Sequence, residues 1–370
     1  MSEPASALAA VTHPDPYPYY ADLVANRPLH RDDALGLWVA ASAAAVSAAF
    51  TSEICRVRPP AEPVPKALAG TAAGDVFGRM VRMNDGAYHV RMKPGVSATV
   101  AMLDPAAITR HAETAARRLA GELQPAADPA RIADFAFRLP PHTVGALLGL
   151  PADVLPAVAA STDDFVRGLA PGASAADVER GAAAARGLID AVRTLPRYQA
   201  AGDETVANVV GFFWQSYEAT AALIASTLVA LARHGEAREL VRRQPQALAA
   251  VVSEVTRHDA PVQNTRRFVA ANGVVAGQEM KEGDTVLLVL AAANRDPAAN
   301  LDPARFDPAR RERRSFTFSF GAHACPGETL AVMMASAGVA RLLADGVEPE
   351  RLAASFSYRP SANMRMPLFA

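Results

Sequence analysis

The sequence of 370 residues contains only two cysteines, Cys55 and Cys325. Two cysteines cannot build a disulfide framework, which favours a reducing compartment. The formal net charge of −1 provides no overall attraction for nucleic acid or an anionic membrane. The most apolar stretch, residues 222–232, is too short to cross a bilayer, and the first residues have neither the basic nor the apolar region of a signal peptide. We therefore expect a cytoplasmic protein that binds neither nucleic acid nor membrane.

Hydrophobic residues make up 51% of the chain, which is enough for a sizeable core. The length alone would suggest about two domains, but we find no repeat, low-complexity tract or linker that divides the chain. We therefore expect one domain over residues 1–370. Helical spacing dominates from about 75 to 200, with breaks predicted at 139–151 and 170–174, where Pro and Gly occur.

The segment 205–235 is the longest predicted helix, and it is apolar on nearly every side. This pattern predicts a helix that runs through the core. A further helix is predicted over 236–258. Val-rich runs separated by turn residues over 265–297 predict short strands, as does 36–42, and a last helix covers 327–344. The predicted fold class is mainly α with a small β region.

Cys325 follows a Phe-rich run and precedes a predicted helix, in the stretch SFTFSFGAHACPG. Several roles are open to its sulfur. It could be a buried structural thiol, or a nucleophile with His323 as its base. A zinc site is disfavoured because no further Cys or close His pair supplies the other ligands. The remaining role is that of the single thiolate ligand of a haem iron.

The haem role explains the neighbouring residues best. Phe318 and Phe320 can shield the sulfur from water, while Gly321 and Gly327 allow a tight turn that directs backbone amides at it. The predicted helix that begins near Gly327 would point its positive N-terminal end at the negative sulfur.

The spacing F-x-x-G-x-x-x-C-x-G, formed by Phe318, Gly321, Cys325 and Gly327, resembles the haem-binding loop of the cytochrome P450 family. The resemblance extends from DPYPYYADL near the N-terminus to YRPSANMRMPL near the end. It implies a cytochrome P450-like fold: one mostly helical domain in which haem b lies between the long central helix and the Cys325 loop, with Cys325 as the iron ligand.

Two further motifs occur in the order expected for this family. Glu254 and Arg257 match its E-x-x-R motif, whose spacing allows the two charges to pair across one helical turn. The segment PARF resembles a following motif, and the resemblance implies that its Arg305 completes a buried charge cluster.

Haem carries two propionates, so cations should converge on it. The resemblance places this role on His89, Lys93, Arg267 and His323. Lys93 stands where bacterial members usually have Arg, which keeps the charge and loses the two-pronged hydrogen bond. The neighbours Arg91 and Arg266 could exchange roles with these residues.

The central helix departs from the family pattern of a small pair followed by an acid and an alcohol. Gln215 replaces the first small residue, Glu218 keeps the acid, and Ala219 replaces the alcohol that helps deliver protons during oxygen activation. Thr220 matches a second, less critical Thr. Three outcomes are open: a water or substrate hydroxyl relays protons in an ordinary monooxygenase; hydrogen peroxide is the oxidant, with Glu218 as acid–base and Gln215 positioning it; or the enzyme catalyses oxidative coupling.

We therefore predict a haem-thiolate oxidoreductase, a monooxygenase or peroxygenase, that oxidises a small organic molecule. Its partner would be a ferredoxin or flavodoxin, unless hydrogen peroxide replaces it. A basic run before the Cys loop either receives that partner or is a solvated face: Arg310, Arg311, Arg313 and Arg314. A haem-binding protein without turnover and a cysteine hydrolase are more distant alternatives. The segment between 187–196 and the central helix is short for the family, as if the preceding helix were mostly lost.

Overall fold

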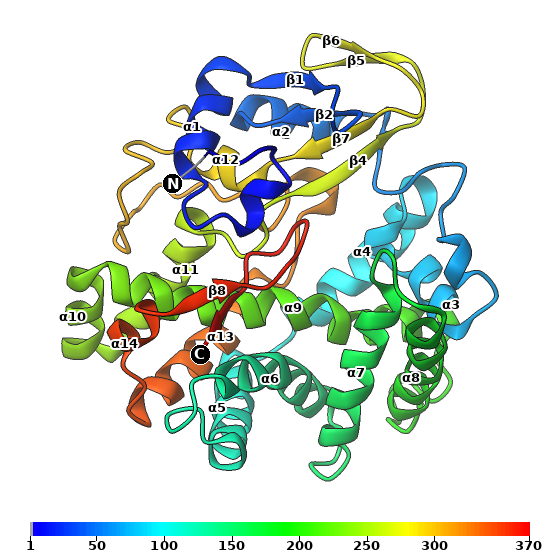
Figure 1. Ribbon diagram of the computed structural model, residues 1–370. Helices are drawn as coiled ribbons and strands as arrows, with labels where there is room; N and C mark the ends of the chain where they lie inside the picture. The colour runs from blue at the N-terminus through cyan, green and yellow to red at the C-terminus, as the bar shows by residue number, and fades with distance from the viewer. Residues whose placement is uncertain (1–2) are drawn as a thin grey trace.

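The computed structural model describes residues 3–370. Helices form most of the molecule, and a five-stranded sheet lies at one end, uppermost in Figure 1. The helices are α1 (Tyr17–Asn26), α2 (Ala43–Thr51), α3 (Ala72–Arg79), α4 (Gly86–Ala101), α5 (Pro105–Leu123), α6 (Arg131–Leu148), α7 (Leu155–Leu169), α8 (Ala175–Arg193), α9 (Asp203–Arg233), α10 (Gly235–Arg243), α11 (Leu248–His258), α12 (Leu290–Asn294), α13 (Glu328–Ala344) and α14 (Pro349–Ala353). The predicted class, mainly α with a small β region, is confirmed.

The main sheet has the order β1-β2-β7-β4-β3. Its strands pair antiparallel except for β2 and β7, which run parallel. Two hairpins, β5–β6 and β8–β9, stand apart from it. The strands are β1 (Leu29–Asp32), β2 (Leu37–Ala40), β3 (Cys55–Arg56), β4 (Thr265–Val269), β5 (Gly273–Val275), β6 (Gln278–Met280), β7 (Thr285–Leu288), β8 (Phe356–Tyr358) and β9 (Pro367–Phe369).

Helix α9 is the axis of the helical part. Helices α6, α11, α13 and α14 and strand β9 pack against it, and it crosses the middle of the molecule in Figure 1. Its residues 221–229 are buried without interruption, as expected for a helix that is apolar over its whole circumference. The predicted core helix over 205–235 is thus confirmed, with ends shifted by two residues.

Two of the predicted helix limits were wrong, both because of proline. The break expected within 139–151 occurs only at Gly149, because α6 continues through Pro140 and Pro141. Both prolines are buried, and α6 packs along α9, so tertiary packing offsets the backbone hydrogen bonds that prolines cannot make. The helix predicted over 236–258 is instead divided before Pro245, since proline disfavours helical geometry in the residue that precedes it.

The connections around α8 agree with the sequence. The break predicted at 170–174 separates α7 from α8. Residues 194–202 lead directly from α8 into α9 without a helix, as the short segment before the central helix predicted. Among residues 3–370, no helix combines the length and the hydropathy needed to span a membrane.

A fully buried ion pair joins α11 to the long irregular segment that precedes the Cys325 loop. Arg257 Nε donates to Glu254 Oε1 over 3.1 Å, and neither side chain is exposed to solvent. The two terminal nitrogens of the same guanidinium group, Nη1 and Nη2, donate to the backbone carbonyls of Pro303 (2.8 Å) and Arg305 (2.9 Å), respectively. Glu254 Oε1 also accepts the backbone N–H of Asp307. This pair therefore fixes the path of residues 303–307.

The role expected for Arg305 needs correction. Its side chain is exposed, and it contributes only its carbonyl oxygen to the cluster. Arg310 supplies the additional cation, because its Nε lies 3.5 Å from Glu254 Oε1 and its side chain is only 9% exposed. The chain turns back after Asp307, which brings the later arginine to the carboxylate.

Removing the Glu254 charge should destabilise the fold. We expect Glu254→Gln to lower the free energy of unfolding by about 3–5 kcal/mol, because it leaves the buried Arg257 guanidinium without its counter-ion. Chemical denaturation measures this change. Glu239→Gln is the matched control, since its carboxylate pairs with Arg242 and Arg243 on the surface and should leave the midpoint near that of the wild type. Equal midpoints for both variants would contradict the structural role of Glu254.

His258, at the end of α11, should make stability depend on pH. Burial, with Arg295 nearby, lowers the pKa of His258 to about 3. The ring is held neutral, because Nε2 faces the Ala304 carbonyl at 2.8 Å and Nδ1 faces Arg295 Nη2 at 3.0 Å. The unfolded chain gains this proton near pH 6.5, so stability is present above that pH and is lost as the pH falls towards 3.

We expect this single group to remove about 2 kcal/mol of stability between pH 7 and pH 5. Denaturation of the wild type and of His258→Gln at both pH values measures the contribution. The variant should show the smaller decrease by about that amount. A decrease of the same size in both proteins would show that His258 is protonated in the folded state.

Candidate active site

Cys325 lies in a tight turn between the 3₁₀ segment Gly321–His323 and helix α13. Its backbone N–H donates to the Phe318 carbonyl over 2.8 Å, and the Gly327 N–H donates to its Sγ over 3.3 Å. Gly321 has φ = +66°, a left-handed conformation that glycine adopts without strain. The turn therefore holds the sulfur at the start of α13, with a backbone amide directed at it.

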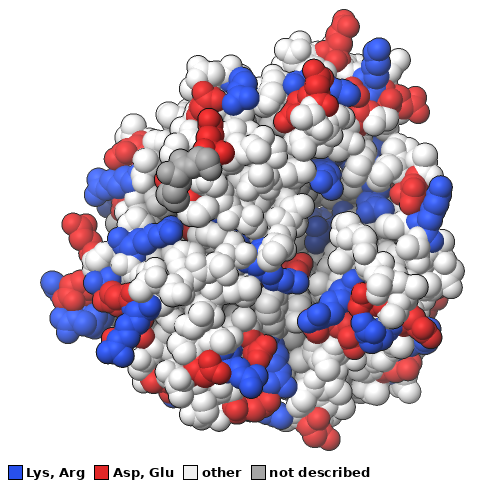
Figure 2. Space-filling model, in the orientation of Figure 1, with Lys and Arg blue, Asp and Glu red and all other residues white. Residues whose placement is uncertain are grey.

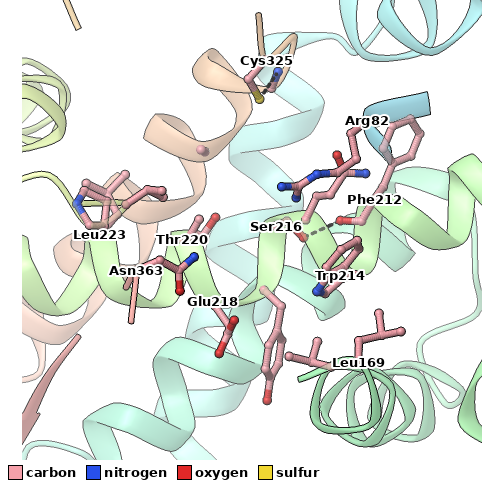
Figure 3. A pocket seen from close by; sticks show the side chains of 18 of the residues that line it. Arg82, Leu169, Phe212, Trp214, Ser216, Glu218, Thr220, Leu223, Cys325 and Asn363 are labelled. Carbon is pink, nitrogen blue, oxygen red and sulfur yellow. Dashed lines mark hydrogen bonds between the residues drawn. The ribbon is translucent and has the colours of Figure 1, made fainter. Parts of the chain in front are cut away.

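The sulfur faces a large cavity of about 1440 Å³, whose opposite wall is α9. In Figure 3, Cys325 lies above α9, and the Thr220 side chain is on the side of that helix nearer to it. Cys325 is accessible, so it is not the buried structural thiol that was considered. The cavity exceeds the usual ~300–1,000 Å³ of small-ligand sites, so it has room for a planar cofactor and a substrate together.

Basic residues from three separate elements gather at one end of this cavity. Lys93, on α4, donates to the Ala324 carbonyl over 2.7 Å. Arg267, on β4, is buried and lies over the Phe50 ring. The rings of His89 and His323 lie 4.3 Å apart, centroid to centroid. The structure thus brings together the four residues proposed for the haem propionates, although they are far apart in the sequence.

Asp85 orients this group, and the sequence interpretation missed it. Its Oδ1 lies 2.9 Å from His323 Nε2, and its Oδ2 accepts the backbone N–H of Val57. Burial raises the pKa of Asp85, but the hydrogen bonds from His323 and Val57 outweigh it, so the carboxyl ionises more readily than usual. His323 is therefore held by Asp85, and across residues 3–370 no hydrogen bond pairs it with Cys325 as a catalytic base.

Burial dominates the electrostatics of the basic residues. Burial, and then the charges of His323 and Lys93, lower the pKa of His89 to about 4. Burial lowers the pKa of Arg267 to about 10 and shifts that of Lys93 in the same direction. An anion at this end of the cavity would offset the cost of burying these charges.

The residues present fit a haem. A sulfur directed into the cavity supplies one axial ligand. His89 Nε2 is buried and has no hydrogen-bond partner within residues 3–370, and Arg267 makes no ion pair in the same part of the chain. Donors of this kind suit the two propionates. No group of three or more His, Cys, Asp or Glu side chains in the described residues could hold a separate metal ion.

The side chains of α9 divide between its two faces. Thr220 is buried, and its Oγ1 has no hydrogen-bond partner among residues 3–370. Gln215 lines the cavity, but its Nε2 donates over 2.9 Å to Gly211 of its own helix. Glu218 lies on the side of α9 away from Cys325 (Figure 3) and accepts from Arg359 Nη1 over 2.9 Å. Catalytic roles for Gln215, Glu218 and Thr220 remain predictions, and that of Glu218 requires the ion pair to open.

Two other expectations about the loop differ in outcome. Phe318 lines the cavity, as a residue that shields the sulfur should. Phe320 was wrongly assigned this role, because its side chain is 40% exposed and lies beside Arg314 at the surface. Residues two apart in an extended segment point to the same side, but the left-handed conformation of Ser319, with φ = +65°, interrupts the extended segment between the two phenylalanines. The two phenylalanines therefore do not share a face.

The comparisons with known proteins agree with this geometry. The family model described as Cytochrome P450 matches residues 199–345. The chain is 37% identical over 129 residues to 6-deoxyerythronolide B hydroxylase of Saccharopolyspora erythraea, covering 35% of this chain and 32% of that protein. It is 34% identical over 147 residues to Vitamin D(3) 25-hydroxylase of Pseudonocardia autotrophica, covering 40% and 36%. The matched stretch thus spans about a third of the length of these curated relatives.

Similarity in three dimensions covers nearly the whole chain. The crystal structure of CalO2 superposes with a TM-score of 0.79 and 28% sequence identity over 96% of both chains. The structure of P450BioI, solved with a fatty-acid-ligated acyl carrier protein, superposes with a TM-score of 0.78 at 21% identity over 95% of this chain and 96% of that one; this second likeness concerns the fold alone. On the fold, the cysteine loop and these comparisons together, the chain has the cytochrome P450 fold and matches the cytochrome P450 family model over residues 199–345.

Proposed function

We propose that this protein is a haem-thiolate oxidoreductase that oxidises a small organic molecule, acting as a monooxygenase. The observation that carries the proposal is the position of Cys325, whose sulfur faces the central helix α9 across the cavity and accepts a backbone N–H from Gly327. Such a donor stabilises a thiolate. The relatives named as hydroxylases support the same reaction class.

The proposed cofactor is haem b, held by Cys325 at the iron and by cations at the propionates. His89, Lys93, Arg267 and His323 would hold the propionates, and Asp85 orients His323 through its 2.9 Å contact. When bound, the haem supplies the oxygen activation, and the thiolate donates electron density that favours O–O cleavage. The protein supplies the binding site, the orientation of the substrate and the path for protons.

The apolar lining from α6, α7, α9 and β4 would bind the substrate. Phe137 and Phe212 are among the side chains that line this part of the cavity. A ferredoxin or flavodoxin would dock on the face of the Cys325 loop. Arg311 and Arg314 are exposed there, whereas Arg310 is occupied by the Glu254 cluster. The basic run therefore offers fewer free cations than its sequence suggests.

A peroxide-driven reaction is the second candidate, and the residue at position 219 favours it. Ala219 lines the cavity where the family pattern has its proton-relaying alcohol. Hydrogen peroxide brings its own protons, so that one carboxylate could take a proton from one oxygen and return it to the other. Glu218 would serve as that carboxylate, and Gln215 would position the peroxide, after rearrangement of the bonds to Arg359 and Gly211.

Replacement of Cys325 tests the cofactor ligation. The reduced protein with bound carbon monoxide should show the red-shifted Soret band of thiolate-ligated haem, and Cys325→Ser should lose it, because a neutral hydroxyl cannot replace the anionic sulfur. Absorption spectroscopy measures both. Cys55→Ser is the matched control, since Cys55 is buried in β3 and makes up part of the sheet core. An unshifted band in the wild type would refute the proposal.

The oxidant can be identified through α9. We expect Glu218→Gln to reduce peroxide-supported turnover of a phenolic surrogate substrate by roughly 10²–10⁴, the usual contribution of a general acid–base group. Ala219→Thr should instead increase the product formed per electron when a reductase and oxygen drive the reaction. Arg359→Gln is the control: it releases Glu218 without removing it, and should not cause the same loss.

The opposite pattern would support the ordinary monooxygenase. In that case the wild type turns over with reductase and oxygen, gains nothing from peroxide and is indifferent to Glu218→Gln. Proton delivery would then depend on water or on a substrate hydroxyl.

A further inference from the structure

The charges that line the cavity are unequally neutralised. Each of its carboxylates has an ion-pair partner: Asp134 with Arg131, Asp163 with Arg167, Asp177 with Arg180, and Glu218 with Arg359. Among residues 3–370, five cations that line the cavity have no carboxylate partner: Arg58, Arg82, Lys93, Arg266 and Arg267. Figure 2 shows Lys and Arg side chains within the hollow on this face of the molecule. The cavity therefore requires anions.

The proposed haem accounts for part of this excess. Its two propionates would neutralise Lys93 and Arg267, which lie with His89 and His323 at one end of the cavity. Three cations are left over: Arg58 is half-buried, and Arg82 and Arg266 are exposed. Arg58 and Arg82 remain within the cavity wall with no anion assigned to them.

Arg82 is the cation placed most directly for a bound molecule. It extends from the 3₁₀ segment Val81–Met83 into the space between Cys325 and α9 (Figure 3). Within the described chain it makes no hydrogen bond or ion pair. Its guanidinium carbon lies 5.0 Å from the centroid of the Trp214 ring. Its side chain is exposed in the open cavity. Desolvation by the surrounding protein lowers the pKa of Arg82, and Cys325 acts in the opposite direction.

An aromatic pair holds the two spare cations on one wall. The rings of Phe77 and Trp214 lie 6.0 Å apart. The guanidinium carbon of Arg58 lies 4.4 Å from the centroid of the Phe77 ring, while Arg82 contacts Trp214. Arg58 also donates to the Pro63 carbonyl, which fixes its Nε. Cation–π contacts hold guanidinium groups in place without neutralising their charge, so both remain available to an anion.

We propose that Arg82 is the specificity residue of the cavity and binds the carboxylate of an acidic substrate, with Arg58 adding positive charge and Trp214 forming the adjoining wall. This inference rests on the proposed haem function and narrows its substrate class to organic monocarboxylates. The guanidinium fork matches a carboxylate with two parallel hydrogen bonds. The rest of the lining is largely apolar, which suits the hydrocarbon part of such an acid.

Matched ligand pairs test the proposal on the haem-loaded protein. Cinnamate is compared with cinnamamide and decanoate with decanamide, since each amide keeps the shape and loses the charge. Dissociation constants come from calorimetry and from the Soret perturbation. We expect the wild type to bind at least one acid more than tenfold tighter than its amide. Arg82→Gln should weaken acid binding by about 10- to 100-fold and leave amide binding unchanged, while Arg82→Lys should restore part of the preference.

Arg138→Gln is the charge-matched control. Arg138 also lines the cavity, but it already pairs with Glu122 over 2.6 Å, so its loss should alter the acid preference less than threefold. Three results would overturn the proposal: no acid preferred over its amide by the wild type, equal weakening of acid and amide in Arg82→Gln, or loss of haem from Arg82→Gln, which would assign Arg82 to a propionate. A wild type without the thiolate Soret band refutes the haem function instead, and calorimetry still decides the role of Arg82.

Discussion

The buried ion pair between Glu254 and Arg257 is the constraint on which the position of the cysteine depends. Between α12 and the 3₁₀ segment Gly321–His323, residues 295–320 form no regular helix or strand. Backbone groups in such a segment need partners outside the usual ladders. The Arg257 guanidinium and the Glu254 carboxylate supply them at residues 303–307. The Cys325 loop follows this segment, so an error in its path would move the sulfur.

Two asparagines continue the same arrangement towards the cysteine. The Asn294 side chain accepts the N–H of Phe316 and donates to Thr317 Oγ1 over 2.9 Å. The Asn300 side chain makes two bonds to the backbone of Arg314, one to its N–H and one to its carbonyl. Asn294 and Asn300 are almost fully buried. The loop is therefore attached to the protein core by side-chain amides, with Cys325 about eight residues beyond the last of these contacts.

The sequence predicted those parts of the site that depend on short, fixed spacings. A spacing of three residues brings Glu254 and Arg257 together in any helix. The Cys325 turn needs only the ten consecutive residues 318–327. Arg305 was wrongly assigned to the buried cluster because a loop has no periodicity, and only its actual path shows that Arg310 reaches Glu254. The strand and helix types were largely predictable, whereas the helix through Pro140 and Pro141 depends on packing against α9, which no local pattern contains.

Arg82 is a second residue whose role could not be predicted from the sequence. Nothing near it in the sequence marks it as unusual, since its neighbours Val81 and Met83 are ordinary apolar residues. Its significance comes from Trp214, which lies far along the chain, and from the pairing of every carboxylate in the cavity. An unpaired cation can be recognised only after all possible counter-ions have been placed in space.

Helical geometry explains why Glu218 and Thr220 of α9 do not face the same part of the cavity. Successive residues turn by about 100°, so that Ser216 and Thr220 lie close to one face, while Glu218 lies about 200° from Ser216. The structure follows this rule, since Glu218 reaches Arg359 on the far side of the helix and Thr220 is on the side nearer to Cys325. The acid at 218 and the part of the cavity next to Cys325 therefore lie on opposite sides of α9, although both line the cavity. Any proton that moves between them must pass along α9 through water, the backbone or a bound substrate, and a carboxylate held by Arg82 would lie on the cavity side of that path.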